Sequence, residues 1–143
     1  MFRRLTDSIL ASPQISIADL AEAKAQGVGL VINNRPEGES DDQVSGAEIE
    51  SAARALGMDY VAIPVTHAGF SGPQIDAMAA ALANGEGKIL AYCRSGTRST
   101  LLWALAQASA GADLAEVTAQ AEAAGYDVTA VRPLMDMLKA RNG

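Results

Sequence analysis

The sequence predicts an α/β fold with a largely parallel central sheet flanked by helices. Three short apolar runs, bounded by polar residues, glycine or proline, have the length of buried strands: residues 29–33, 60–65 and 88–92. Segments with helical apolar spacing lie between these runs and after them. Alternation of this kind favours strands that pair in parallel, with the helices packed on the faces of the sheet.

Caps and glycines delimit the expected helices. Ser16 and Asp19 resemble a capping box, with aspartate in place of the usual glutamate. Gly57 is a suitable end for the second helix, and Pro73 stands at an early helical position, where its missing N–H has little effect. Helices are expected over residues 16–25 and 46–56, from residue 71, from residue 99, and over 113–125 and 133–141.

The composition fits one soluble globular domain covering residues 1–143. A chain of 143 residues is long enough for one core but too short for two, and its apolar fraction of 49% is that of an ordinary globular protein. The formal net charge of −6 argues against a nucleic-acid-binding or anionic-membrane surface, because clustered Lys and Arg attract phosphates. No apolar stretch approaches the roughly 20 residues that cross a bilayer, and no signal-peptide pattern follows the N-terminus. We therefore expect a cytoplasmic protein.

Cys93 is the single cysteine of the chain, which excludes an intramolecular disulfide. With His67, the single histidine, it supplies too few ligands for a structural zinc site. We therefore expect no metal and no organic cofactor, and the sequence leaves the oligomeric state open. A lone cysteine is commonly a small buried hydrophobe, but the residues around Cys93 favour a reactive thiol.

Cys93 stands at the end of an expected strand and begins an anion-binding loop that leads into a helix: Cys93-Arg94-Ser95-Gly96-Thr97-Arg98-Ser99. A helix N-terminus directs N–H groups and partial positive charge at one point, which favours an anion and the thiolate form of a cysteine. Gly96 permits a tight turn, and Arg98 offers a planar fork to an oxyanion. Ser99 is expected to donate its hydroxyl to the Cys93 thiolate.

A second polar segment follows the strand at residues 29–33. Asn34 and Arg35 stand at the carboxyl end of that strand, the edge of an open α/β sheet where ligands collect. They are candidate pocket-lining residues; the alternative is a turn stabilised by Asn side chains and Pro36. The acidic stretch of residues 37–45 has no apolar periodicity, and we expect it to be exposed and mobile.

Three motifs together resemble the phosphatase-like domain family of the bacterial beta-lactamase hydrolase-like proteins, a domain of unknown function. They are Val31-Ile32-Asn33-Asn34-Arg35-Pro36-Glu37-Gly38-Glu39, Ile63-Pro64-Val65 and Ala91-Tyr92-Cys93-Arg94-Ser95-Gly96-Thr97-Arg98-Ser99, and the resemblance covers residues 2–110. It implies a fold like that of tyrosine and dual-specificity phosphatases. Some classifications call family members sulfur transferases.

The chain departs from the tyrosine phosphatase pattern in two places. Tyr92 replaces the histidine that precedes the cysteine, and only four residues, not five, separate Cys93 from Arg98, a spacing similar to that of rhodaneses. The loop that often carries an aspartate as general acid here contains His67, a candidate catalytic acid. Asp41 and Asp42 are competing candidates from the acidic stretch.

Three functions remain open from the sequence. The first is a cysteine-dependent phosphatase-like hydrolase that acts on a small anionic or phosphorylated molecule. The second is a rhodanese-like sulfurtransferase that carries a persulfide on Cys93. The third is a module that binds an anion or a partner without turnover.

Overall fold

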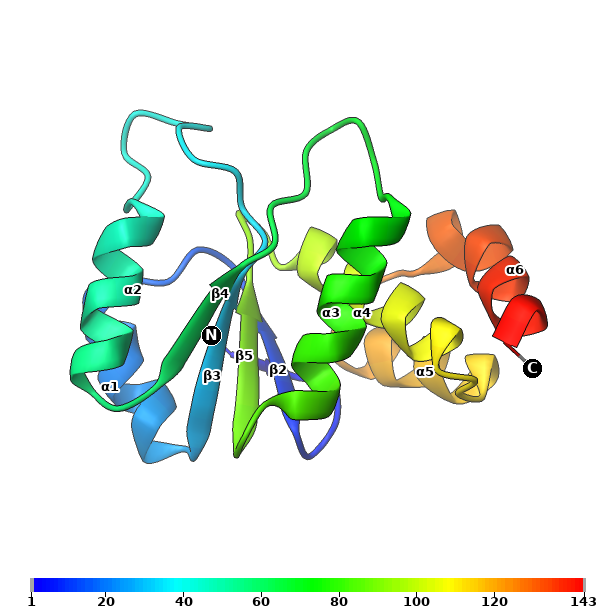
Figure 1. The fold of residues 1–143 in the computed structure, drawn as a ribbon, viewed down its shortest axis with the longest axis horizontal. Coiled ribbons are helices and arrows are strands. Elements are labelled where there is room, and N and C mark those ends of the chain that lie inside the picture. The colour runs from blue at the N-terminus through cyan, green and yellow to red at the C-terminus, as the bar shows by residue number, and fades with distance from the viewer. Residues whose placement is uncertain (1, 143) are drawn as a thin grey trace.

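The computed structural model describes residues 2–142, which contain one five-stranded sheet (Figure 1). The strands lie in the order β1, β2, β5, β3, β4. Their bounds are Arg3–Arg4 (β1), Ile9–Ser12 (β2), Val28–Asn33 (β3), Asp59–Ala62 (β4) and Lys88–Tyr92 (β5). Strand β1 is antiparallel to β2 and all other pairs are parallel, which confirms the predicted α/β class with a largely parallel sheet.

The helices of this part of the chain are α1 (Ile17–Ala25), α2 (Gly46–Ala55), α3 (Gly72–Asn84), α4 (Thr97–Ser109), α5 (Leu114–Ala123), the 3₁₀ helix η1 (Thr129–Val131) and α6 (Arg132–Asn142). The capping box of α1 is present: the Ser16 hydroxyl accepts from the Asp19 N–H, and the Asp19 carboxylate accepts from the Ser16 N–H. Helix α4 begins two residues earlier than expected, at Thr97 rather than Ser99.

Strands β1 and β2 were not predicted. Strand β2 pairs in parallel with β5, with Ile9 opposite Ile89 and Ala11 opposite Ala91, and all four of its residues are buried. Four residues followed by Pro13 are too few to show a periodicity. Strand β4 is shorter than the predicted run of residues 60–65, although the N–H groups of Ile63 and Val65 still donate to the Asn33 and Asn34 carbonyls.

Helices cover both faces of the sheet (Figure 1). Helices α1 and α2 lie on one face, over the side chains of Val31, Leu90 and Tyr92, and helices α3 to α6 lie on the other, over Ile32 and Ala91. Successive strand residues thus point to opposite cores, as the period of two in a strand requires. No helix within residues 2–142 is long and apolar enough to cross a membrane.

Helix α4 lies at the centre of the larger core. It contacts β2 and β5 on one side and α3, α5 and α6 on the other. Its buried side chains surround it almost completely and include Leu102, Trp103 and Leu105. A helix held on every side has a fixed N-terminus, and this N-terminus lies at the carboxyl edge of the sheet. The loops after β3 and β4 rise at the same edge (Figure 1).

Candidate active site

Cys93 directly follows β5 and is completely buried. The Gly96 N–H donates a hydrogen bond to its sulfur over 3.1 Å, so the loop folds back over the thiol. This turn requires a φ of +92° at Gly96, a left-handed conformation that favours glycine. No side chain caps α4 at Gly96, whereas side chains cap α1, α2, α3 and α5. The start of α4 is therefore suited to an anion rather than to a cap.

Three consecutive carbonyl groups of this loop, those of residues 94–96, have hydrogen-bond partners. The Arg94 carbonyl accepts from the Gln14 N–H. The Ser95 carbonyl accepts from the Tyr126 hydroxyl, and the Gly96 carbonyl accepts from the N–H and hydroxyl of Thr100. Because the carbonyls are held in this way, the N–H of Gly96 is directed at Cys93. The Gly96 N–H thus has a fixed direction toward the thiol, which is where a bound anion would need a donor.

Arg98, on the first turn of α4, has its guanidinium held along one edge. Nη1 and Nη2 donate to the two carboxylate oxygens of Glu39 over 2.7 and 2.8 Å, and Nη1 also donates to the Val65 carbonyl over 2.7 Å. No other oxygen within residues 2–142 accepts a hydrogen bond from Arg98. Its remaining contact is with Cys93. The Nε–H and the second Nη2–H therefore have no oxygen acceptor, and such charged N–H groups are suited to an anion.

Glu39, which was not predicted as a site residue, accepts from two arginines. Besides Arg98, it accepts from the Arg35 Nε over 2.9 Å, and its side chain is only 16% exposed. The hydrogen bond from Arg98 is the main reason why the pKa of Glu39 falls from 4.5 to about 2. Its position four residues after Arg35 was the one available sequence signal, because such a spacing allows a local ion pair.

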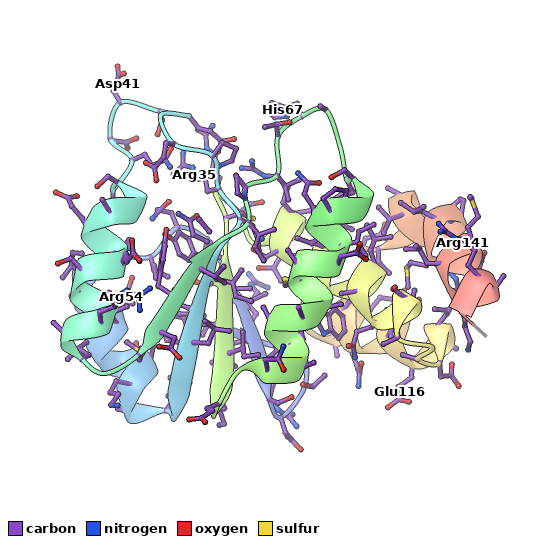
Figure 2. The ribbon with its side chains drawn as sticks, viewed as in Figure 1. Arg35, Asp41, Arg54, His67, Glu116 and Arg141 are labelled. Carbon is purple, nitrogen blue, oxygen red and sulfur yellow. The ribbon has the colours of Figure 1, made fainter. Side chains whose placement is uncertain are left out.

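Arg35 does not line the pocket, contrary to the prediction. It is 4% exposed and donates to Glu39, to the Gln14 side chain and to the Ser40 hydroxyl. These bonds fix the loop after β3, and Figure 2 shows Arg35 beneath that loop. The acidic stretch was expected to be exposed and mobile, but Glu39 and Ser40 are partly buried and tied to Arg35. The reason is that a buried guanidinium needs several acceptors.

Asn34 and Ser99 are linked by a buried side-chain hydrogen bond between the end of β3 and the first turn of α4. Asn34 is fully buried, so it too does not line the pocket as predicted; its amide donates to the Ile63 carbonyl over 2.9 Å. The Ser99 hydroxyl donates to the Asn34 side-chain oxygen over 2.8 Å. The expected bond from Ser99 to Cys93 is therefore not the one formed. Asn34 instead connects β3 to α4 and to the segment after β4.

The open part of the site is a cavity of about 310 Å³ lined by Glu39, His67, Arg94 and Arg98. His67 reaches it from the loop after β4 (Figure 2). Asp41 points outward at the tip of the loop after β3 (Figure 2), and Asp42 is exposed and accepts from the Ser40 hydroxyl. His67 is thus the candidate acid that the structure brings to the cavity. Asp41 and Asp42 do not line it.

The other predicted loop residues have more local contacts. Ser95 and Thr97 are exposed, and their hydroxyls are 3.0 Å apart, with the Ser95 hydroxyl as donor. The Thr97 N–H donates to the Ser95 hydroxyl over 3.3 Å. No group of three His, Cys, Asp or Glu side chains within residues 2–142 is placed to hold a metal ion. A hollow of about 360 Å³ between β4 and α3 is mostly apolar and lies away from Cys93.

A family model described as the phosphatase-like domain of the beta-lactamase hydrolase-like protein matches residues 1–110. The chain belongs to this family. The matched region contains β1 to β5, the loop of Cys93 and helix α4, and ends before α5. The resemblance seen in the sequence is therefore confirmed.

One relative, the beta-lactamase hydrolase-like protein of Agrobacterium fabrum, is 37% identical over 108 residues. These residues are 76% of this chain but 25% of that protein, so the chain spans about a quarter of its relative's length. A crystal structure of a candidate phosphatase from Neisseria meningitidis is 29% identical, with a TM-score of 0.83, and covers 95% of this chain and 96% of that one.

The tyrosine phosphatase-like fold is confirmed by a further solved structure. The phosphotyrosine complex of Pseudomonas aeruginosa TpbA has a TM-score of 0.70 at 16% identity, covering 99% of this chain and 89% of that chain. At this identity the similarity concerns the fold. Together, the family and the fold support a phosphatase-like enzyme.

Proposed function

We propose that the protein is a cysteine-dependent phosphatase-like hydrolase with Cys93 as nucleophile. The observation that carries the proposal is the hydrogen bond from the Gly96 N–H to the Cys93 sulfur at the uncapped start of α4. This donor stabilises a thiolate, which is the nucleophilic form of cysteine. The Arg98 guanidinium interacts with the same thiol, and its N–H groups that have no oxygen acceptor are suited to a phosphoryl group.

The reaction has two steps. The Cys93 thiolate attacks phosphorus, a P–S bond forms, and the P–O bond to the leaving alcohol breaks as that oxygen takes up a proton. Water then attacks the phosphocysteine, the P–S bond breaks, and inorganic phosphate leaves with the thiolate regenerated. In both steps the loop N–H groups and Arg98 bind the non-bridging oxygens, where charge accumulates in the transition state.

His67 is the proton donor in this proposal. It lines the cavity beside Arg98, whereas Asp41 and Asp42 do not. Glu39 also lines the cavity, but its pKa of about 2 leaves it without a proton at neutral pH. His67→Asn should therefore slow the hydrolysis of phosphoesters with poor leaving groups more than that of an activated aryl phosphate. Equal losses on both substrates would exclude His67 as the acid.

The decisive experiment is hydrolysis of an aryl phosphate by the protein and by Cys93→Ser. Phosphate release should disappear in the variant, and mass spectrometry of the rapidly quenched parent protein should find phosphate on Cys93. Release that persists in Cys93→Ser would overturn the proposal, as would the absence of any release from the parent protein.

A sulfurtransferase is the second candidate, and the short spacing of four residues between Cys93 and Arg98 favours it. In that reaction the thiolate attacks the outer sulfur of thiosulfate, a persulfide forms, and sulfite leaves as the S–S bond of thiosulfate breaks. Cyanide then removes the outer sulfur as thiocyanate and restores the thiolate. Incubation with thiosulfate and cyanide, followed by mass spectrometry of Cys93, separates this candidate from the hydrolase. If neither reaction occurs, a binding module without turnover is the remaining function.

A further inference from the structure

Tyr126 lies outside the region that the family model matches, yet its hydroxyl reaches the loop of Cys93. It follows α5, is 9% exposed, and donates to the Ser95 carbonyl over 3.2 Å. That carbonyl belongs to the same peptide unit as the Gly96 N–H, which donates to the Cys93 sulfur over 3.1 Å. One rigid peptide thus lies between the tyrosine hydroxyl and the nucleophile.

We propose that Tyr126 is a positioning residue for the Cys93 nucleophile, acting through the Ser95–Gly96 peptide. A trans peptide directs its C=O and N–H in opposite directions, so a donor that holds the oxygen also aims the hydrogen. A donor at the oxygen further polarises the peptide and strengthens the bond that its N–H makes to a thiolate. The inference rests on the proposed function, in which this thiolate is the nucleophile.

The peptide needs such a restraint because of Gly96. A peptide plane rotates when ψ of its first residue and φ of its second change together, and glycine at the second position accepts either sign of φ. Ser95 is exposed, and Tyr126 supplies its carbonyl with a hydroxyl donor from another part of the chain. Without that donor, the orientation in which the N–H points away from Cys93 becomes more accessible.

Tyr126 is itself held in place. The Arg3 guanidinium lies 5.5 Å from the centre of its ring and donates to the Ala124 carbonyl, just before Tyr126. The Tyr126 N–H donates to the Ala121 carbonyl at the end of α5. Burial raises the pKa of Tyr126 above its usual value of 10, so the hydroxyl keeps its proton and remains a donor. Contacts with Arg3 in β1 and with the end of α5 therefore fix the orientation of the Tyr126 side chain.

Tyr126→Phe tests the inference, because it removes the hydroxyl and keeps the ring that packs beside Gly96. The first measurement is the rate at which iodoacetamide alkylates Cys93 at a mildly acidic pH, where the rate reports the thiolate population. The loss of one hydrogen bond should lower this rate, and kcat/KM for an aryl phosphate, by about three- to tenfold. The charged groups near the thiol, Arg98, Arg94 and Glu39, are unchanged in this variant.

Tyr60→Phe is the matched control. The Tyr60 hydroxyl accepts from Asn33 on the other face of the sheet and does not touch the loop, so its loss should leave the alkylation rate unchanged. A lower rate in Tyr126→Phe alone, at an unchanged melting temperature, supports the inference. An unchanged rate in Tyr126→Phe, or equal losses in both variants, overturns it. Alkylation needs no turnover, so a protein that fails to hydrolyse aryl phosphates still gives a result.

Discussion

Glu39 and Arg98 are 59 residues apart in the sequence and form a two-bond ion pair beside Cys93. The pair and the Val65 carbonyl together fix the orientation of the guanidinium, and the N–H groups on its other edge have no oxygen acceptor. Glu39 is therefore a positioning residue in the proposed reaction. Because Arg35 also donates to Glu39, the carboxylate joins the loop after β3 to the anion-binding loop.

Glu39→Gln should impair phosphoester hydrolysis. The glutamine amide removes the negative charge and places N–H groups against the N–H groups of Arg98, so the guanidinium loses its fixed orientation. We expect kcat/KM to fall by at least about tenfold, because the loss of one charge-assisted hydrogen bond has an effect of that size. Glu39→Asp keeps the charge and should retain more activity than Glu39→Gln. Steady-state kinetics on an aryl phosphate test this, and equal activity of Glu39→Gln and the parent would contradict it.

The same carboxylate should make stability depend on pH. Its pKa is depressed from 4.5 to about 2 in the folded protein, so its stabilising contribution is complete above pH 4.5 and is lost as the pH falls through about 2. Urea unfolding at several pH values in this window should therefore show a steeper loss of stability for the parent than for Glu39→Gln. Parallel curves for the two proteins would show that the ion pair does not contribute in this way.

Ser99→Ala should lower stability and leave the chemistry intact. The Ser99 hydroxyl donates to the Asn34 side chain in a fully buried position, and its loss leaves an acceptor unpaired. We expect a cost of about 1–3 kcal/mol in the free energy of unfolding. Ser51→Ala, at an exposed position of α2, is the control and should change stability by less than about 0.5 kcal/mol. A fall in kcat without loss of stability would instead favour the role at Cys93 predicted from the sequence.

The sequence was sufficient to predict those elements whose pattern lies within a few neighbouring residues. The apolar runs of β3 and β5 and the capping box of α1 lie within a few residues, and the position of Cys93 between a strand and a helix follows from them. Strand β2 lacked such a signal, because its four residues become a strand only by pairing with β5. Its burial on both faces is a tertiary effect.

The partners of the loop could not be predicted from the sequence, because they are set by contacts between distant segments. Glu39 reaches Arg98 across 59 residues, and Tyr126 reaches Ser95 across 31. In the acidic stretch, only the spacing of four residues from Arg35 distinguishes Glu39 from Asp41 and its neighbours, and the sequence does not show that Arg35 is buried. Long-range ion pairs of this kind depend on which side chains the fold leaves partly desolvated.

Gly96→Ala should disable the loop more than it destabilises the protein. At a φ of +92° an added Cβ carries a strain of about 1–2 kcal/mol. Here the Cβ would also overlap the Tyr126 hydroxyl, so that the loop must shift. Because the Gly96 N–H is the donor to Cys93, we expect kcat/KM on an aryl phosphate to fall by about 100-fold or more.

Gly111→Ala separates the two causes. Gly111 has a φ of +88°, and an added Cβ there has no atom within 4 Å, so this variant carries the backbone strain without the overlap. The backbone strain should lower the free energy of unfolding, measured in urea, by a similar amount in both variants. The overlap with Tyr126 should lower it further in Gly96→Ala. Only Gly96→Ala should lose activity and slow the alkylation of Cys93. If Gly96→Ala retained the parent's kcat/KM, the left-handed turn would not be needed to aim the Gly96 N–H at the thiol.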